Sequence, residues 1–60
     1  MKKQVEVIVE GMGPLDFAGE AVLDEDQGVL LVIFDDGSSR VFNWDYVISF
    51  YQYTDEELGL

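Results

Sequence analysis

Cysteine and histidine, the two residue types with the most versatile side-chain chemistry, are missing from this 60-residue chain. Without cysteine the chain has no disulfide, no thiol nucleophile and no thiolate ligand for a metal. Without histidine it has no zinc-finger ligand and no imidazole general base, so a serine or threonine nucleophile would depend on a carboxylate alone for its activation. We therefore expect neither an enzyme nor a bound cofactor or metal.

Positive charge is also scarce, because three lysines and arginines stand against thirteen aspartates and glutamates, giving a formal net charge of −10. Such a field repels nucleic acids and anionic membranes, so neither is an expected direct partner, and it attracts basic proteins. No apolar run approaches the roughly 20 residues that cross a bilayer. The opening Met-Lys-Lys is followed by Gln4 and Glu6 rather than by an apolar signal-peptide core, so we expect a cytoplasmic protein.

The chain has the length of one domain, spanning residues 1–60. A domain of about 60 residues buries only about 60% of the surface that its unfolded chain exposes, so its own core is marginal. Hydrophobic residues make up 48% of the chain, which favours folding over disorder. Because disulfides and metals are excluded, self-association is the remaining source of stability. We expect a homo-oligomer, with a dimer favoured.

Short apolar stretches between turn-forming residues predict an all-β domain. The stretch 29–34 (VLLVIF) does not alternate with polar residues, so its second face should be covered by another part of the chain or by a partner. Gly19, inside a strand, marks a bend or bulge where a small barrel turns a corner. Thr54 and Glu57 have the spacing of a capping box, which predicts one helical turn before a short tail. The expected strands are residues 3–10, 16–23, 29–34, 39–42 and 47–53.

Two segments resemble parts of known small β-barrels. The break FNWDYV over residues 42–47 resembles the short 3₁₀ turn that enters the last strand of SH3-like barrels. Phe17-x-Gly19 followed by Asp24 is similar to the second-strand pattern of Sm-like proteins. The resemblance implies a small five-stranded antiparallel SH3-like or Sm-like barrel. The basic loop residues with which Sm-like rings hold RNA are absent, and the acidic loop and aromatic groove of peptide-binding SH3 domains are not matched.

The acidic side chains have two interpretations. They keep a β-rich chain soluble, or they bind a partner with a basic surface. Carboxylates arrayed at strand spacing can imitate DNA phosphates and occupy a nucleic-acid-binding cleft. In size and charge the chain is similar to small accessory proteins of bacteriophages, several of which inhibit host enzymes. The leading hypothesis is therefore a protein-binding module of the phage-inhibitor type, a DNA mimic that acts on a host nucleic-acid enzyme or defence protein. Its candidate acidic residues are Asp24, Glu25, Asp26, Asp35, Asp36 and Asp45.

Aromatic residues provide a second candidate surface. A small barrel cannot bury the combined ring area of Trp44, Tyr46, Tyr51 and Tyr53. Tryptophan and tyrosine are also common in interface hot spots. We expect them to form one cluster, as a homodimer seam or a partner site. Arg40, the only arginine, either anchors an anionic ligand or forms a cross-strand ion pair with an aspartate. Two alternatives stay open: an oligomer that sequesters a small ligand near Arg40, and a purely structural assembly subunit.

Overall fold

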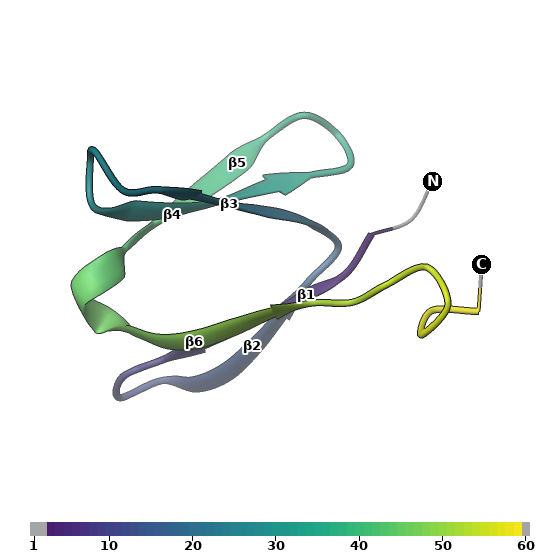
Figure 1. The fold of residues 1–60 in the computed structure, drawn as a ribbon, viewed down its shortest axis with the longest axis horizontal. Coiled ribbons are helices and arrows are strands. Elements are labelled where there is room, and N and C mark those ends of the chain that lie inside the picture. The colour runs from purple at the N-terminus through teal and green to yellow at the C-terminus, as the bar shows by residue number, and fades with distance from the viewer. Residues whose placement is uncertain (1–2, 60) are drawn as a thin grey trace.

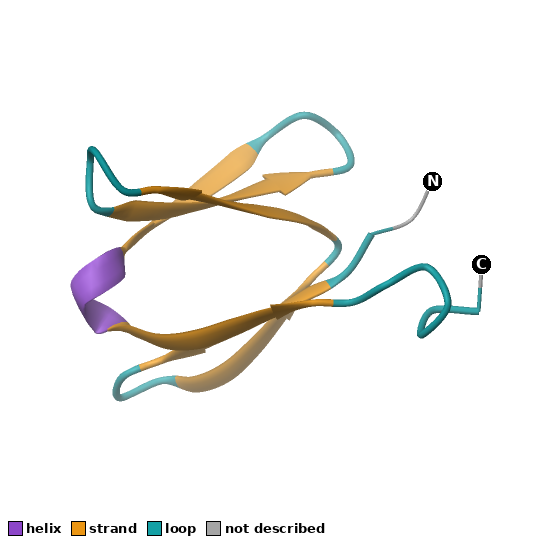
Figure 2. Ribbon diagram, viewed as in Figure 1, coloured by secondary structure: helices purple, strands orange, loops and turns teal. Residues whose placement is uncertain are grey.

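The computed structural model describes residues 3–59, which form two antiparallel β-sheets (Figures 1 and 2). The strands are β1 (Val5–Val9), β2 (Gly13–Phe17), β3 (Gly19–Asp24), β4 (Val29–Phe34), β5 (Ser39–Asn43) and β6 (Val47–Gln52), with a 3₁₀ turn, η1 (Trp44–Tyr46), before β6. One sheet has the order β2-β1-β6 and the other β3-β4-β5. Within the described range no helix is long and apolar enough to cross a membrane.

The all-β class is confirmed, but the expected closed barrel of five strands is wrong. The single strand expected at residues 16–23 is divided, because the chain bends at Ala18 and passes from the β2-β1-β6 sheet into the β3-β4-β5 sheet. The bend lies beside Gly19, where the sequence predicted one. In the described part of the chain, backbone strand pairing stays within each sheet, so the two sheets do not join into a continuous ring.

Gly19 is required by a close approach between two strands. It pairs with Phe34 of β4. A Cβ atom added at Gly19 would lie 2.4 Å from the backbone oxygen of Ile33, well inside any normal contact. Backbone atoms cannot swing aside as the end of a side chain can, so only glycine fits at this corner.

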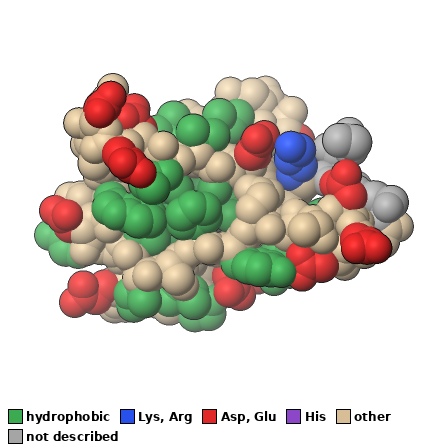
Figure 3. Space-filling view, viewed as in Figure 1, with side chains coloured by type: hydrophobic (Ala, Val, Ile, Leu, Met, Phe, Trp, Pro, Cys, Tyr) green, Lys and Arg blue, Asp and Glu red, His purple; other side chains and the backbone are tan. Residues whose placement is uncertain are grey.

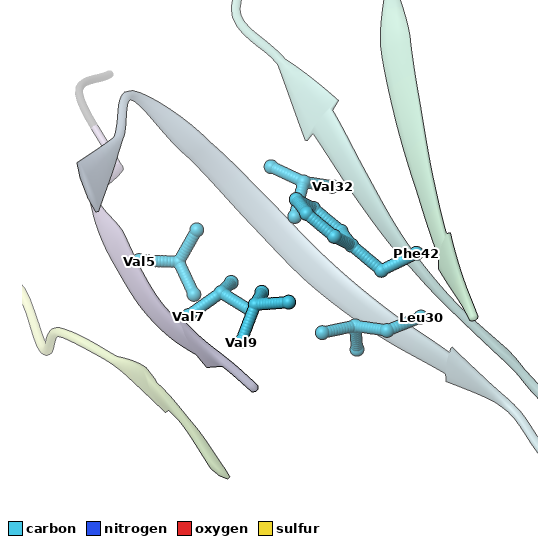
Figure 4. Close-up of a cluster of buried hydrophobic side chains, with 6 residues drawn as sticks. All are labelled: Val5, Val7, Val9, Leu30, Val32 and Phe42. Atoms are coloured by element: carbon cyan, nitrogen blue, oxygen red, sulfur yellow. The ribbon is translucent and has the colours of Figure 1, made fainter. Parts of the chain in front are cut away.

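The core lies between the two sheets (Figure 4). The valines at the odd positions of β1 alternate with Glu6 and Ile8 and so share one face, which points inward and meets side chains from β4 and β5. The Phe17 ring lies 5.8 Å from each of the Phe34 and Phe42 rings, measured between centroids, so aromatic packing holds the sheets together near the bend. The buried side chains are Val5, Val7, Val9, Leu30, Val32 and Phe42.

The Gln52 side chain links the two sheets where backbone pairing does not. Its Oε1 accepts a hydrogen bond from the backbone N–H of Ala21 in β3, at 2.8 Å. Its Nε2 donates to the carbonyl oxygens of Gly19, at 3.1 Å, and Gln4, at 3.0 Å. One amide therefore pairs with the edge of β3 as a strand would, and it closes the seam between β3 and β6.

Both turns predicted in the C-terminal half are present. The break before the last strand is η1, whose first turn is capped by the Asn43 side chain accepting from the backbone N–H of Asp45 at 3.0 Å. Beyond β6, Thr54 Oγ1 accepts from the backbone N–H of Glu57 at 3.2 Å, and Glu57 Oε1 accepts from the backbone N–H of Thr54 at 3.0 Å. This reciprocal pair is the predicted capping box.

Candidate interaction site

Three chain segments that are distant in sequence meet at one end of the molecule, on the left in Figure 1: the β1–β2 turn, the β3–β4 turn and η1. Two backbone hydrogen bonds fix them. The Glu10 N–H donates to the Tyr46 carbonyl at 2.8 Å, and the Trp44 N–H donates to the Gly28 carbonyl at 3.0 Å. We call the carboxylates of these segments the acidic end: Glu10, Asp24, Glu25, Asp26 and Asp45.

The acidic end combines negative charge with exposed aromatic surface. Trp44 and Tyr46 are both exposed there, and the Trp44 ring meets Phe50 edge-on with centroids 5.9 Å apart, so one side of the indole is held by the domain. The structure describes two cations, and neither pairs with a carboxylate of the acidic end. Lys3 pairs with Glu20 at 3.2 Å at the other end of the molecule, and the guanidinium of Arg40 lies over the Phe42 ring. Figure 3 shows acidic side chains at this end with no basic side chain beside them on the visible face.

The structure brings together four of the six acidic candidates and separates the other two. Asp35 and Asp36 lie in the β4–β5 turn, at the opposite end of β4 from the acidic end. Asp36 accepts hydrogen bonds from the hydroxyl and the backbone N–H of Ser38, and these bonds lower the pKa of Asp36. This pair therefore shapes a hairpin turn instead of extending the acidic surface.

Glu10 is a member of the acidic end that sequence reasoning did not select. It follows the first strand directly and resembles any other acidic residue at a turn. Only the hydrogen bond to Tyr46 places it beside η1. In residues 3–59, no group of three or more acidic side chains is arranged to hold a metal ion.

The four candidate aromatics lie in two places, Trp44 and Tyr46 in η1 and the other two at the end of β6 and just beyond it, whereas the sequence predicted one cluster. Tyr51 and Tyr53 lie near the C-terminal turn, with ring centroids 5.1 Å apart. The Tyr51 hydroxyl donates to Glu57, which raises the pKa of Tyr51 and lowers that of Glu57. Partial burial, followed by the charges of Glu6, Asp16 and Glu57, raises the pKa of Tyr53. This pair is thus part of a second acidic surface, distant from η1.

Arg40 does not form a cross-strand ion pair with an aspartate, which was one of the two roles that the sequence left open for it. It is exposed on β5, and its guanidinium carbon lies 5.5 Å from the centroid of the Phe42 ring. Among the described residues the ion pair present is that of Lys3 with Glu20. A half-open groove of about 430 Å³ lies near the bend, and Arg40 is not among its lining residues, which are Lys3, Gln4, Asp16, Phe17, Ala18, Asp35 and Leu58.

Comparison with known proteins places the chain among phage proteins. Residues 1–59 match the family described as "Phage L5 gene 47-like protein". The chain is 55% identical over 40 residues to the "Gene 47 protein" of Mycobacterium phage L5, an alignment that spans 67% of this chain and 58% of that protein. No solved structure matches the chain.

Proposed function

We propose that this chain, which belongs to the phage L5 gene 47-like family, is a small non-enzymatic accessory protein that works by binding another protein through its acidic end. The observation that carries the proposal is the convergence of five carboxylates with the exposed rings of Trp44 and Tyr46 on three hydrogen-bonded segments. Aromatic side chains supply desolvated contact area at interfaces. Surrounding charges set the rate and the specificity of association.

The charge of this end determines the kind of partner. Among residues 3–59 no cation pairs with these five carboxylates, which favours a partner rich in lysine and arginine. The cations of such a partner can also lie over the faces of the Trp44 and Tyr46 rings. We propose that the partner surface is a cleft that normally holds nucleic acid, because carboxylates spread over three segments can take the places of successive phosphates.

The proposal can be tested with two variants that change the net charge equally. The first replaces Asp24, Glu25, Asp26 and Asp45 by their amides, and the second does the same to four acids outside the acidic end, Asp16, Asp35, Asp55 and Glu56. Amides keep the hydrogen-bond acceptors, including the oxygen of Asp24 that accepts from the Gln27 N–H. A pull-down from a host lysate with the wild-type protein first identifies a candidate partner. Binding is then measured with that partner in purified form.

We expect the first variant to lose binding and the second to keep most of it. Wild-type affinity should fall as salt rises, because exposed charges are screened beyond about 8–10 Å at physiological ionic strength. Double-stranded DNA should compete if the partner surface is a nucleic-acid cleft. Equal loss in both variants would show that total charge, and not the acidic end, drives binding. Affinity that is independent of salt would contradict the proposal.

A further inference from the structure

The outward face of the β3-β4-β5 sheet presents an ordered pattern of apolar and polar side chains. Its nine residues form three cross-strand rows: Glu20–Ile33–Ser39, Val22–Leu31–Val41 and Asp24–Val29–Asn43. The five apolar side chains make a cross, and the four polar ones occupy its corners. Val22, Ile33 and Val41 are 43%, 40% and 59% exposed. This is the second face of the apolar stretch 29–34, for which the sequence predicted a cover.

No described segment of the chain covers this face, and its charge argues against a basic partner. The face has carboxylates only at two corners, both on β3, and Glu20 is already paired with Lys3 at 3.2 Å. A basic protein would be drawn to the acidic end instead. The core contains only six buried hydrophobic side chains among the described residues, so the domain would gain stability from further apolar burial. We propose that a second copy of this chain covers the face.

The polar side chains at the four corners distinguish between two possible two-fold packings of the copies. A two-fold axis parallel to β4 places Leu31 opposite Leu31 of the second copy and Val22 opposite Val41 of the second copy. The same axis places Asp24 opposite Asn43 of the second copy and Glu20 opposite Ser39 of the second copy. Each carboxylate then meets an amide or a hydroxyl that can donate to it. Asn43 retains its amide hydrogens for this purpose, because its Oδ1 already accepts from Asp45.

The alternative axis, perpendicular to the strands, places Asp24 opposite Glu20 of the second copy. Packed sheets are about 10 Å apart, so side chains at facing corners touch. Asp24 and Glu20 each bring a negative charge to such a corner, and Lys3, which is paired with Glu20, balances only one of them, so the other carboxylate has neither a cation nor a donor opposite it. The parallel axis also has a penalty, the repulsion between the two acidic ends, which it sets side by side, but this penalty is weaker. That repulsion acts between solvated carboxylates and is screened by salt. The parallel arrangement therefore predicts a dimer that tightens as salt is added, opposite to the behaviour of a basic partner.

Sedimentation equilibrium from micromolar to millimolar protein tests the surface. We expect the wild type to dimerise and Val41→Glu to raise the dimer dissociation constant by at least about tenfold. Ile48→Glu is the matched control: Ile48 is 67% exposed, but it lies on β6 in the other sheet. Far-UV circular dichroism verifies that both variants fold. A wild type that stays monomeric at millimolar concentration, or Val41→Glu that dimerises like the wild type, would overturn the proposal.

A charge swap tests the axis with substitutions that preserve the local structure. Asn43→Asp keeps the oxygen that caps η1, and Asp24→Asn keeps the oxygen that accepts from the Gln27 N–H at 3.1 Å. We expect Asn43→Asp alone to weaken the dimer, because it places two carboxylates opposite each other. The double variant should restore the dimer. A double variant no tighter than Asn43→Asp, or a dimer that weakens with salt, would overturn the arrangement. These measurements use no other protein, so their outcome is separate from that of the acidic-end proposal.

Discussion

Replacing Gln52 by leucine tests whether one side chain joins the two sheets. Leucine has nearly the same size but removes all three hydrogen bonds of the Gln52 amide. The Gln4 carbonyl keeps a donor, because the Tyr53 N–H also donates to it at 2.9 Å. No other hydrogen-bond partner among the described residues can take the place of the Gln52 amide at the Ala21 N–H and the Gly19 carbonyl. The variant therefore leaves two backbone groups without their partners at a half-buried seam.

The expected cost follows from these two groups. A buried polar group that loses its partner costs about 1–3 kcal/mol, and the lower part of that range applies where water has partial access. We expect Gln52→Leu to reduce the free energy of unfolding by about 2–3 kcal/mol. A domain of this size has a total of about 3–9 kcal/mol. The midpoint of thermal unfolding should fall by about 10–20 °C, since each kcal/mol shifts it by about 4–8 °C in small domains.

Urea and thermal unfolding followed by circular dichroism measure this loss. The urea midpoint should fall while the slope stays constant, because the folded state remains compact. A thermal midpoint of Gln52→Leu within about 3 °C of the wild type would show that the Gln52 amide does not hold the two sheets together. Water or a small rearrangement would then satisfy the Ala21 N–H and the Gly19 carbonyl with no loss in the free energy of unfolding.

Gln52→Glu provides a control of nearly identical shape with a defined pH dependence. A carboxyl here can still accept from the Ala21 N–H, but only its protonated form can donate, and its single hydrogen serves the Gly19 carbonyl, since the Gln4 carbonyl keeps the Tyr53 N–H. Its folded pKa should therefore lie above the unfolded value of about 4.3. The variant should approach wild-type stability below about pH 4 and lose stability as the pH rises through 4.3 towards the folded pKa. A difference from the wild type that does not change with pH would contradict this account.

Two further predictions concern the corner and the C-terminal turn. Gly19→Ala should destabilise the fold by about 1–3 kcal/mol, because its Cβ would lie 2.4 Å from the Ile33 oxygen; Ala18→Ser, at the exposed neighbouring position, should have little effect in the same unfolding assay. Tyr51→Phe should raise the pKa of Glu57 towards its ordinary value of 4.5, because the hydroxyl that holds it down is removed. An NMR titration of the Glu57 carboxyl that gives the same pKa in both proteins would contradict the second prediction.

Local patterns predicted most of the secondary structure but not its division between sheets. Alternation placed the β1 valines in the core, and the turn residues placed η1 and the capping box. Strict alternation fails in the last strand, where it would place Ile48 on the same face as Phe50. In the structure a register shift opposite Ile8 and Val9 pairs Val47 with Val9 and leaves Ile48 exposed. A β-bulge changes which residues face inward, and no local signal marked this one.

The candidate sites show the same limit. Local sequence identified acidic turns and exposed aromatics, because each depends on residue type and its nearest neighbours. It could not show that Glu10 lies beside Tyr46, or that Tyr51 lies far from Trp44. These separations depend on strand pairing over long sequence distances.

The β class, the positions of the turns and of most strands, the charge and the absence of histidine and cysteine chemistry could all be predicted from the sequence alone. These properties follow from composition and short-range periodicity. Only the folded chain shows the division at Ala18, the closure of the seam by Gln52 and the placing of the acids on separate surfaces. Only the fold, too, shows that one face of the apolar stretch 29–34 points outward. The physical reason is that each of these features depends on which strands lie side by side, and strand pairing is a property of the whole chain.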